Sequence, residues 1–149
     1  MKAGTMWLSA VVASVMAASA FAQSETTERP YFPDIVAIQN ANFEELEKKY
    51  ASCLSSENAG VVESALSHIG MLKLRYPARK LNVLAPAVDS VAARHSVAEI
   101  RYKAYLVATL LNNPRRFAQE TRRDYSSPDE FFGALAARIH ADIVGKAAR

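Results

Sequence analysis

Two pairs of arginines in the segment RRFAQETRRD are the side chains best suited to bind a charged group. The segment places them around an aromatic and an acidic residue: Arg115, Arg116, Phe117, Glu120, Arg122 and Arg123. A guanidinium group is planar and offers paired N–H donors, so it binds phosphates and carboxylates well. The segment could therefore hold a phosphate, a lipid headgroup or a carboxylate-rich partner. The alternative is a solvated connection between two helices, in which the arginines pair with nearby Glu and Asp.

The single cysteine, Cys53, could act as a nucleophile if the fold brought His68 or His95 beside it. No local signature supports that pair. The chain has no two histidines at i, i+4 spacing and no C-x-x-C. The sequence therefore predicts no catalytic residue, no metal ligand and no cofactor. We expect Cys53 to be a small buried apolar residue. An interchain disulfide and a reactive thiol are the alternatives.

Residues 1–22 have the pattern of a secretory signal peptide. Lys2 is followed by an apolar run rich in Ala and Val, which ends in Ala20-Phe21-Ala22. A retained membrane anchor is the alternative, although the apolar run is short for a span of roughly 20 residues. We expect cleavage after Ala22 and a periplasmic or secreted protein. Export argues against a nucleic-acid partner for the arginines.

The rest of the chain is expected to form one domain with a short lead-in. Residues 23–33 are polar and contain Pro30 and Pro33, which is typical of a flexible segment. Residues 34–149 are predicted to form a single domain without a transmembrane segment. A net charge of +3 is a small excess that identifies no partner, and one cysteine cannot form an internal disulfide.

Helical periodicity dominates this domain, so the predicted class is all-α. Apolar residues recur at i, i+3, i+4 over residues 43–54 and 61–72, and Pro77 ends the second run. A third helix is predicted over residues 81–93. Pro86 lies inside it and indicates a kink or a split there. A fourth helix should end at Asn112-Asn113-Pro114.

The last helix has the clearest start in the chain. The segment SSPDEFF places Ser127 at the N-cap, Pro128 at the first helical position and Glu130 at the third, which is a capping box. Its apolar face is predicted to contain Phe131, Phe132, Leu135, Ile139, and Ile143 or Val144.

The segment EIRYKAYLVATLL, residues 99–111, is predicted to be a helix that is apolar almost all round. One stripe contains Ile100, Ala104, Val107, Ala108 and Leu111, with Tyr105 at its edge. Tyr102, Leu106 and Leu110 lie on roughly the other side. Either the last helix covers this second side through Phe131 and Phe132, or the side is open for a partner. We expect it to be covered, which would make this helix the centre of the core.

The second and fourth helices are weakly similar to each other. VVESALSHIGMLK aligns with IRYKAYLVATLLN about 39 residues further on, with Val61 on Ile100 and Ala65 on Ala104, and an amphipathic helix precedes each. The two segments resemble the second helices of HEAT repeats, a family related to armadillo repeats. The resemblance covers roughly residues 43–114. It implies a short right-handed α-α superhelix of two to three helical hairpins, with a C-terminal capping helix. An ordinary helical bundle with accidental similarity is the alternative.

The resemblance also implies a protein-binding scaffold with no chemistry of its own. We therefore expect a non-catalytic exported adaptor whose partner is another protein and not a nucleic acid. The first alternative is a protein that binds an anion or an envelope surface through Arg115, Arg116, Arg122 and Arg123. A small-ligand carrier is the second. The sequence does not predict the oligomeric state.

Overall fold

The computed structural model of the protein describes residues 40 to 147, and these form helices and connections without any strand. The predicted all-α class is therefore confirmed. The predicted signal peptide, the flexible segment and both ends of the predicted domain lie outside the described residues.

Five α-helices and one 3₁₀ segment make up the described chain. They are α1 (Asn40–Leu54), α2 (Ala59–Arg75), α3 (Leu84–Arg94), α4 (Ala98–Asn112), η1 (Pro114–Arg122) and α5 (Pro128–Ala147). All five predicted helices are present. The segment around the arginines, expected as a connection, is a 3₁₀ segment instead.

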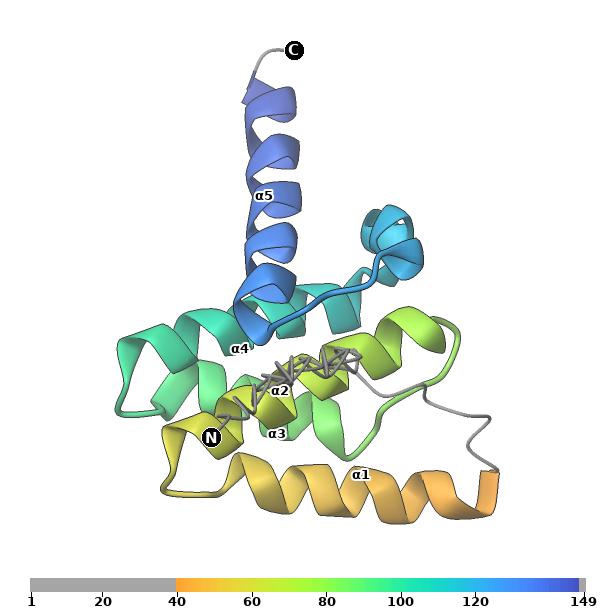
Figure 1. Ribbon diagram of the computed structural model, residues 1–149, viewed down its shortest axis with the longest axis vertical. Coiled ribbons are helices and arrows are strands. Elements are labelled where there is room, and N and C mark those ends of the chain that lie inside the picture. Colours follow the sequence, from red (N-terminus) through yellow and green to blue (C-terminus); the bar gives the residue numbers. More distant parts are fainter. Residues whose placement is uncertain (1–39, 148–149) are drawn as a thin grey trace, which may run out of the picture.

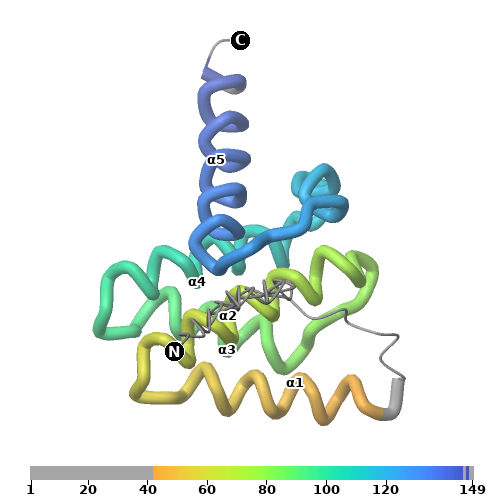
Figure 2. The backbone as a smooth tube through the Cα atoms, in the orientation of Figure 1, coloured from red at the N-terminus to blue at the C-terminus, as the bar shows by residue number. Residues whose placement is uncertain are grey.

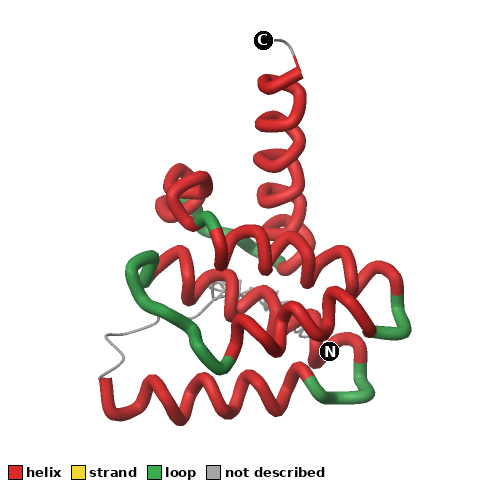
Figure 3. Tube along the Cα trace, turned by 180° about the vertical axis from the view of Figure 1, so that it is seen from behind, coloured by secondary structure: helices red, strands yellow, loops and turns green. Residues whose placement is uncertain are grey.

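The first four helices lie side by side as two hairpins, α1 with α2 and α3 with α4 (Figure 1). The hairpins join through contacts of α2 with α4 and of α1 with α3. Helix α5 rises away from these four, and η1 lies beside it, as the view from behind also shows (Figure 3). Only the first part of α5 lies against the body, because α5 points away from α2 and α4, which run across its base (Figure 1).

Helix α3 starts later than predicted, and this removes the expected kink at Pro86. Since α3 begins at Leu84, Pro86 lies in its first turn, where backbone N–H groups have no partner inside the helix. Val83 at the N-cap has no capping side chain of its own. Its backbone N–H instead donates to Oε2 of Glu47 on α1, at 3.1 Å. A buried carboxylate from another helix thus marks where α3 begins.

Helices α2 and α4 together form the centre of the core. Helix α2 packs against α1, α4, η1 and α5, and α4 packs against α2, α3, η1 and α5. The buried residues of α2 lie on most of its circumference: Val62, Ala65, Leu66, Ser67, Ile69, Gly70, Leu72, Lys73 and Leu74. The expectation that residues 99–111 lie at the centre agrees with these contacts, although one side of α4 carries Tyr102 and Tyr105, which are 54% and 52% exposed.

The other two sides of α4 are covered, as the sequence predicted. Ile100, Ala104 and Val107 are buried, and so are Leu106 and Leu110 on the second side. Tyr102 was grouped with Leu106 and Leu110, and this was wrong. It lies further round the helix, where it faces solvent.

Burial in α2 and α4 recurs, but in a register that differs by one residue from the alignment made on the sequence. Val61 is 40% exposed whereas its aligned residue, Ile100, is buried. The buried residues of the two helices match when they are paired in order: Val62, Leu66, Ile69 and Leu72 with Ile100, Ala104, Val107 and Leu110.

The start of α5 carries the predicted cap, in a modified form. Oγ of Ser127 accepts the backbone N–H of Glu130 at 3.2 Å. The Glu130 carboxylate reaches one residue further back than a standard capping box, and accepts from the backbone N–H and the hydroxyl of Ser126 at 2.9 and 2.8 Å. These hydrogen bonds lower the pKa of Glu130.

Substituting Ser127 by alanine should lower the free energy of unfolding by about 0.5–2 kcal/mol, because the N-cap acceptor is lost. Chemical denaturation of the full chain measures this. Ser127→Asp keeps an acceptor at the cap and is the matched control, which should stay near the parent. Equal stability of Ser127→Ala and the parent would show that the cap contributes nothing.

The end of α5 departs from its predicted apolar face. Phe131, Phe132, Leu135 and Ile139 are buried, but Ile143 and Val144 are 60% and 53% exposed. The last turns of α5 extend beyond α2 and α4, so nothing in the described chain covers these two side chains.

Candidate functional site

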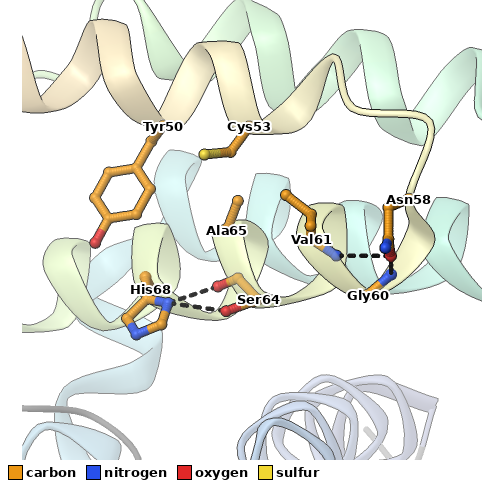
Figure 4. A pocket seen from close by; sticks show the side chains of 8 residues that line it. All are labelled: Tyr50, Cys53, Asn58, Gly60, Val61, Ser64, Ala65 and His68. Atoms are coloured by element: carbon orange, nitrogen blue, oxygen red, sulfur yellow. Dashed lines mark hydrogen bonds between the residues drawn. The ribbon is translucent and has the colours of Figure 1, made fainter.

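A groove lies between the second half of α1 and the first half of α2. Its volume is about 480 Å³ and it is open to solvent along one side. It is lined by two residues of α1, the cap of α2 and one face of α2: Tyr50, Cys53, Asn58, Gly60, Val61, Ser64, Ala65 and His68 (Figure 4). We call it the α1–α2 groove.

Small side chains on α2 leave this space open. Gly60, Ser64 and Ala65 line the side of the groove that α2 provides, opposite Cys53 and Tyr50 of α1 (Figure 4). Ala65 is buried beneath it. Because none of these three side chains reaches far from the α2 backbone, the helices can pack together and still leave a hollow near solvent.

One end of the groove is fixed by the cap of α2. Oδ1 of Asn58 accepts the backbone N–H groups of Gly60 and Val61, at 2.9 and 3.4 Å. The backbone N–H of Asn58 in turn donates to the hydroxyl of Ser56, at 3.2 Å. Asparagine is a favoured N-cap residue for this reason. The cap holds Val61 at the rim, where it is 40% exposed.

Two rings form the other end of the groove. Tyr50 and His68 stack with their centroids 6.0 Å apart and their planes 19° apart. Nδ1 of His68 lies 2.7 Å from the backbone oxygen of Ser64, and since a carbonyl only accepts, Nδ1 carries the proton. Burial, and then the neighbouring Cys53, raise the pKa of Tyr50, so its hydroxyl stays protonated at neutral pH. The end wall is therefore aromatic with polar edges.

Cys53 lines the groove and is only half-buried, whereas the sequence predicted a buried residue. The structure brings His68 to the same groove, but not His95. His95 ends α3, and its Nδ1 accepts the backbone N–H of Val97 at 3.1 Å. Of the two possible nucleophile pairs, only Cys53 with His68 lies in one site, and there Nδ1 of His68 is bonded to Ser64.

The four arginines of the predicted anion site separate into two kinds. Arg116 forms an ion pair with Asp142 of α5 at 2.6 Å, and Arg123 forms one with Glu120 at 3.3 Å. Arg115 and Arg122 are exposed and form no ion pair with the described residues. The reading in which the arginines pair with nearby Glu and Asp thus applies to Arg116 and Arg123, and anion binding by Arg115 and Arg122 stays a prediction.

The segment that carries the arginines is anchored by buried residues. Phe117 is fully buried, and Glu120 accepts a hydrogen bond from the Tyr125 hydroxyl at 2.7 Å. Burial and this carboxylate raise the pKa of Tyr125 well above its usual value. Arg138 of α5 donates to the backbone oxygen of Arg116 at 2.9 Å. Segment η1 is therefore a fixed brace between α5 and the body.

Sequence reasoning missed a buried lysine that joins three helices. Nζ of Lys103 on α4 contacts carboxylates of Glu63 on α2, Glu99 on α4 and Asp129 on α5, the last two at 2.7 and 3.1 Å. Burial alone would lower the pKa of Lys103, but the three carboxylates outweigh it and hold the pKa above its usual value. A lysine inside an otherwise apolar helix was the available signal. The cluster connects helices and offers no open site.

The described residues hold neither a metal site nor a membrane-spanning helix, and no known protein matches the chain. Within residues 40–147 no three His, Cys, Asp or Glu side chains come together as a metal site would require. No helix in that range combines the length and hydropathy needed to cross a bilayer. No protein-family model, no curated protein and no solved structure matches the chain.

Proposed function

We propose that the protein is a non-catalytic, exported helical-repeat module that binds another protein through the α1–α2 groove. The observation that carries the proposal is the open groove itself, with exposed Val61 at its rim and the Tyr50–His68 wall at its end. Aromatic residues and apolar hollows are common where one protein receives a side chain of another.

The form of the groove favours a protein partner over a small ligand. Small-molecule sites usually bury most of the ligand in an enclosed cavity. The α1–α2 groove is open along one side, so a ligand of its size would stay largely in water. An extended segment of a partner could instead place one apolar or aromatic side chain in the groove and use neighbouring surface as well.

The helical arrangement supports the repeat part of the proposal. Two hairpins in sequence, with contacts of α1 with α3 and of α2 with α4, are what two HEAT- or armadillo-like units in a short right-handed superhelix would give. The recurring buried positions of α2 and α4 agree with this. Segment η1 and the first half of α5 would then be the cap, since repeat arrays need a cover at their ends.

A photo-crosslinking experiment tests the groove as the binding site. Cys53→Ser removes the only cysteine, and Glu57→Cys then places a thiol for a benzophenone label just outside the groove. Ala137→Cys in the same background is the matched control, because Ala137 is exposed on α5, away from the groove. Illumination in an envelope extract should give a discrete adduct from position 57 and none from position 137.

Competition identifies whether that adduct depends on the groove. Excess unlabelled full chain should suppress the adduct, and unlabelled Val61→Glu should not, because a carboxylate at the rim opposes an apolar side chain. Equal adducts from positions 57 and 137, or suppression by Val61→Glu as strong as by the parent, would contradict the proposal.

A further inference from the structure

One end of the molecule collects basic side chains from three segments. They come from the last turn of α2, from the connection after it, and from η1 with the residue that follows: Arg75, Arg79, Lys80, Arg115, Arg122 and Arg123. Helix α2 contacts η1, and the last turn of α2, the start of the connection and η1 all lie on the same side of the chain trace (Figure 2). We call this set the basic end.

The acidic side chains nearby do not balance this charge. The same segments contain two carboxylates, Glu120 and Asp124. Glu120 is buried and bonded to Tyr125 and Arg123, so Asp124 is the exposed one. Helix α1 also starts at this end, but its Glu44 and Glu45 each pair with a lysine one turn later, at 2.8 Å.

Helix dipoles account for only part of the basic end. Basic residues in the last turn of a helix are favourable, and this applies to Arg75 and Arg122. Arg79 is half-buried, with its guanidinium 3.9 Å from the centre of the Phe43 ring. Lys80 lies in a connection, outside any helix. Arg115 lies in the first turn of η1, where the dipole disfavours a positive charge. Lys80 and Arg115 are therefore exposed positive charges that local helix energetics do not require.

We propose that the basic end docks the protein on a bilayer surface that exposes anionic phosphate headgroups. The six side chains are spread over three segments, and none of them lines the α1–α2 groove. Such a spread fits a surface with many phosphates better than it fits a single small anion. Arginine, five of the six, binds phosphate through paired N–H donors.

Exposed apolar residues favour a bilayer over a soluble acidic chain. Pro77 and Ala78 lie between Arg75 and Arg79 and are exposed, and Val83, at the end of the same connection, is 41% exposed. Small apolar side chains flanked by basic ones can enter the headgroup boundary while the charges stay at the phosphates. This docking surface is separate from the α1–α2 groove, so it goes beyond the proposed partner binding.

Vesicle co-sedimentation of the full chain tests the docking. Vesicles of mixed phosphatidylglycerol and phosphatidylcholine should bind the protein more strongly than vesicles of phosphatidylcholine alone, and added salt should weaken the difference. Each Lys or Arg at such a surface contributes about a fivefold gain in partitioning, so Arg115→Gln with Arg122→Gln should weaken binding by about 25-fold. Lys80→Gln should weaken it by about fivefold.

The matched control removes two positive charges elsewhere. Arg94→Gln with Arg101→Gln gives the same net charge, but Arg94 ends α3 and Arg101 lies in the first turn of α4, away from the basic end. This double variant should bind within about twofold of the parent, because charges beyond a Debye length are screened. Asp124→Asn should strengthen binding. Every variant shares residues 1–39, so any contribution of that segment to vesicle binding cancels when the binding of a variant is divided by that of the parent.

Three outcomes would overturn the proposal. Equal losses in both double variants would mean that net charge alone attracts the protein to the vesicles. Competition by soluble glycerophosphate at the same phosphate concentration would assign the basic end to a small anion. Binding to polyglutamate but not to anionic vesicles would assign it to an acidic protein. Thermal melting monitored by circular dichroism confirms that each variant compared is folded.

Discussion

Replacing Leu106 by alanine is expected to lower the free energy of unfolding by about 2–5 kcal/mol. Leu106 is 1% exposed, although it lies on the side of α4 away from Ala104. Truncation would remove its buried methyl groups and leave a cavity that the surrounding core residues fill only in part. Urea denaturation of the full chain, with the slope and midpoint fitted together, measures the loss.

The same helix provides the control. Tyr105, the residue before Leu106, is 52% exposed. Tyr105→Ala truncates a larger side chain than Leu106→Ala does, but at an exposed position. It should therefore change the free energy of unfolding by no more than about 0.5 kcal/mol. The comparison separates two roles for this side of α4. A loss below about 1 kcal/mol for Leu106→Ala would mean that Leu106 contributes to a binding surface and not to the core.

Local signals in the sequence predicted the helices well. Pro77 and Pro114 follow the ends of α2 and α4, and Ser127 with Pro128 starts α5. Each of these depends on residues a few positions apart, because a missing N–H or a capping oxygen acts within one helical turn. The local order of residues was therefore enough to predict where these helices begin or end.

The arrangement of the helices depended on contacts that the sequence does not display. The start of α3 is set by Glu47, which lies on α1 far away in the chain. Segment η1 and helix α5 return to pack on both α2 and α4, and no periodicity within residues 61–72 indicates that return. Ile143 has the spacing of the apolar face of α5, yet it lies beyond the body and is exposed.

The candidate site was predicted only in part for the same reason. Cys53 and His68 were recognised as possible neighbours, but the hollow between them results from three small residues on α2 and their distance from α1. Arg116 and Arg123 were predicted together with Arg115 and Arg122. Arg123 pairs with Glu120, three residues earlier, whereas Arg116 pairs with Asp142, which comes near only when α5 folds against η1.

Gly70 lies where the Phe131 ring of α5 packs against α2, and it gives the second large expected effect. A Cβ atom on Gly70 would lie 2.5 Å from Cζ and 2.9 Å from Cε1 of Phe131, closer than atoms can approach. The Phe131 ring is held by two other rings, Tyr125 and Phe132, with centroids 5.3 and 5.4 Å away. Gly70→Ala should therefore force α5 outward and lower the free energy of unfolding by about 1–3 kcal/mol or more.

Gly133 supplies a control of opposite sign. It lies in α5, and a Cβ atom there would meet nothing within 4 Å. Gly133→Ala should raise stability by about 0.5–1 kcal/mol, because alanine loses less backbone entropy than glycine in a helix. Two identical substitutions are thus expected to move the denaturation midpoint in opposite directions.

A double variant assigns the cost of Gly70→Ala to Phe131. Phe131→Leu alone should destabilise the protein, since a fully buried ring is lost. In the Gly70→Ala background the shorter leucine leaves room for the new methyl group, so the same change should cost less or be favourable. If the two losses simply added, the steric conflict with Phe131 would not be the cause. Stabilisation by Gly70→Ala, like that expected for Gly133→Ala, would mean that α5 does not pack on α2 as closely as described.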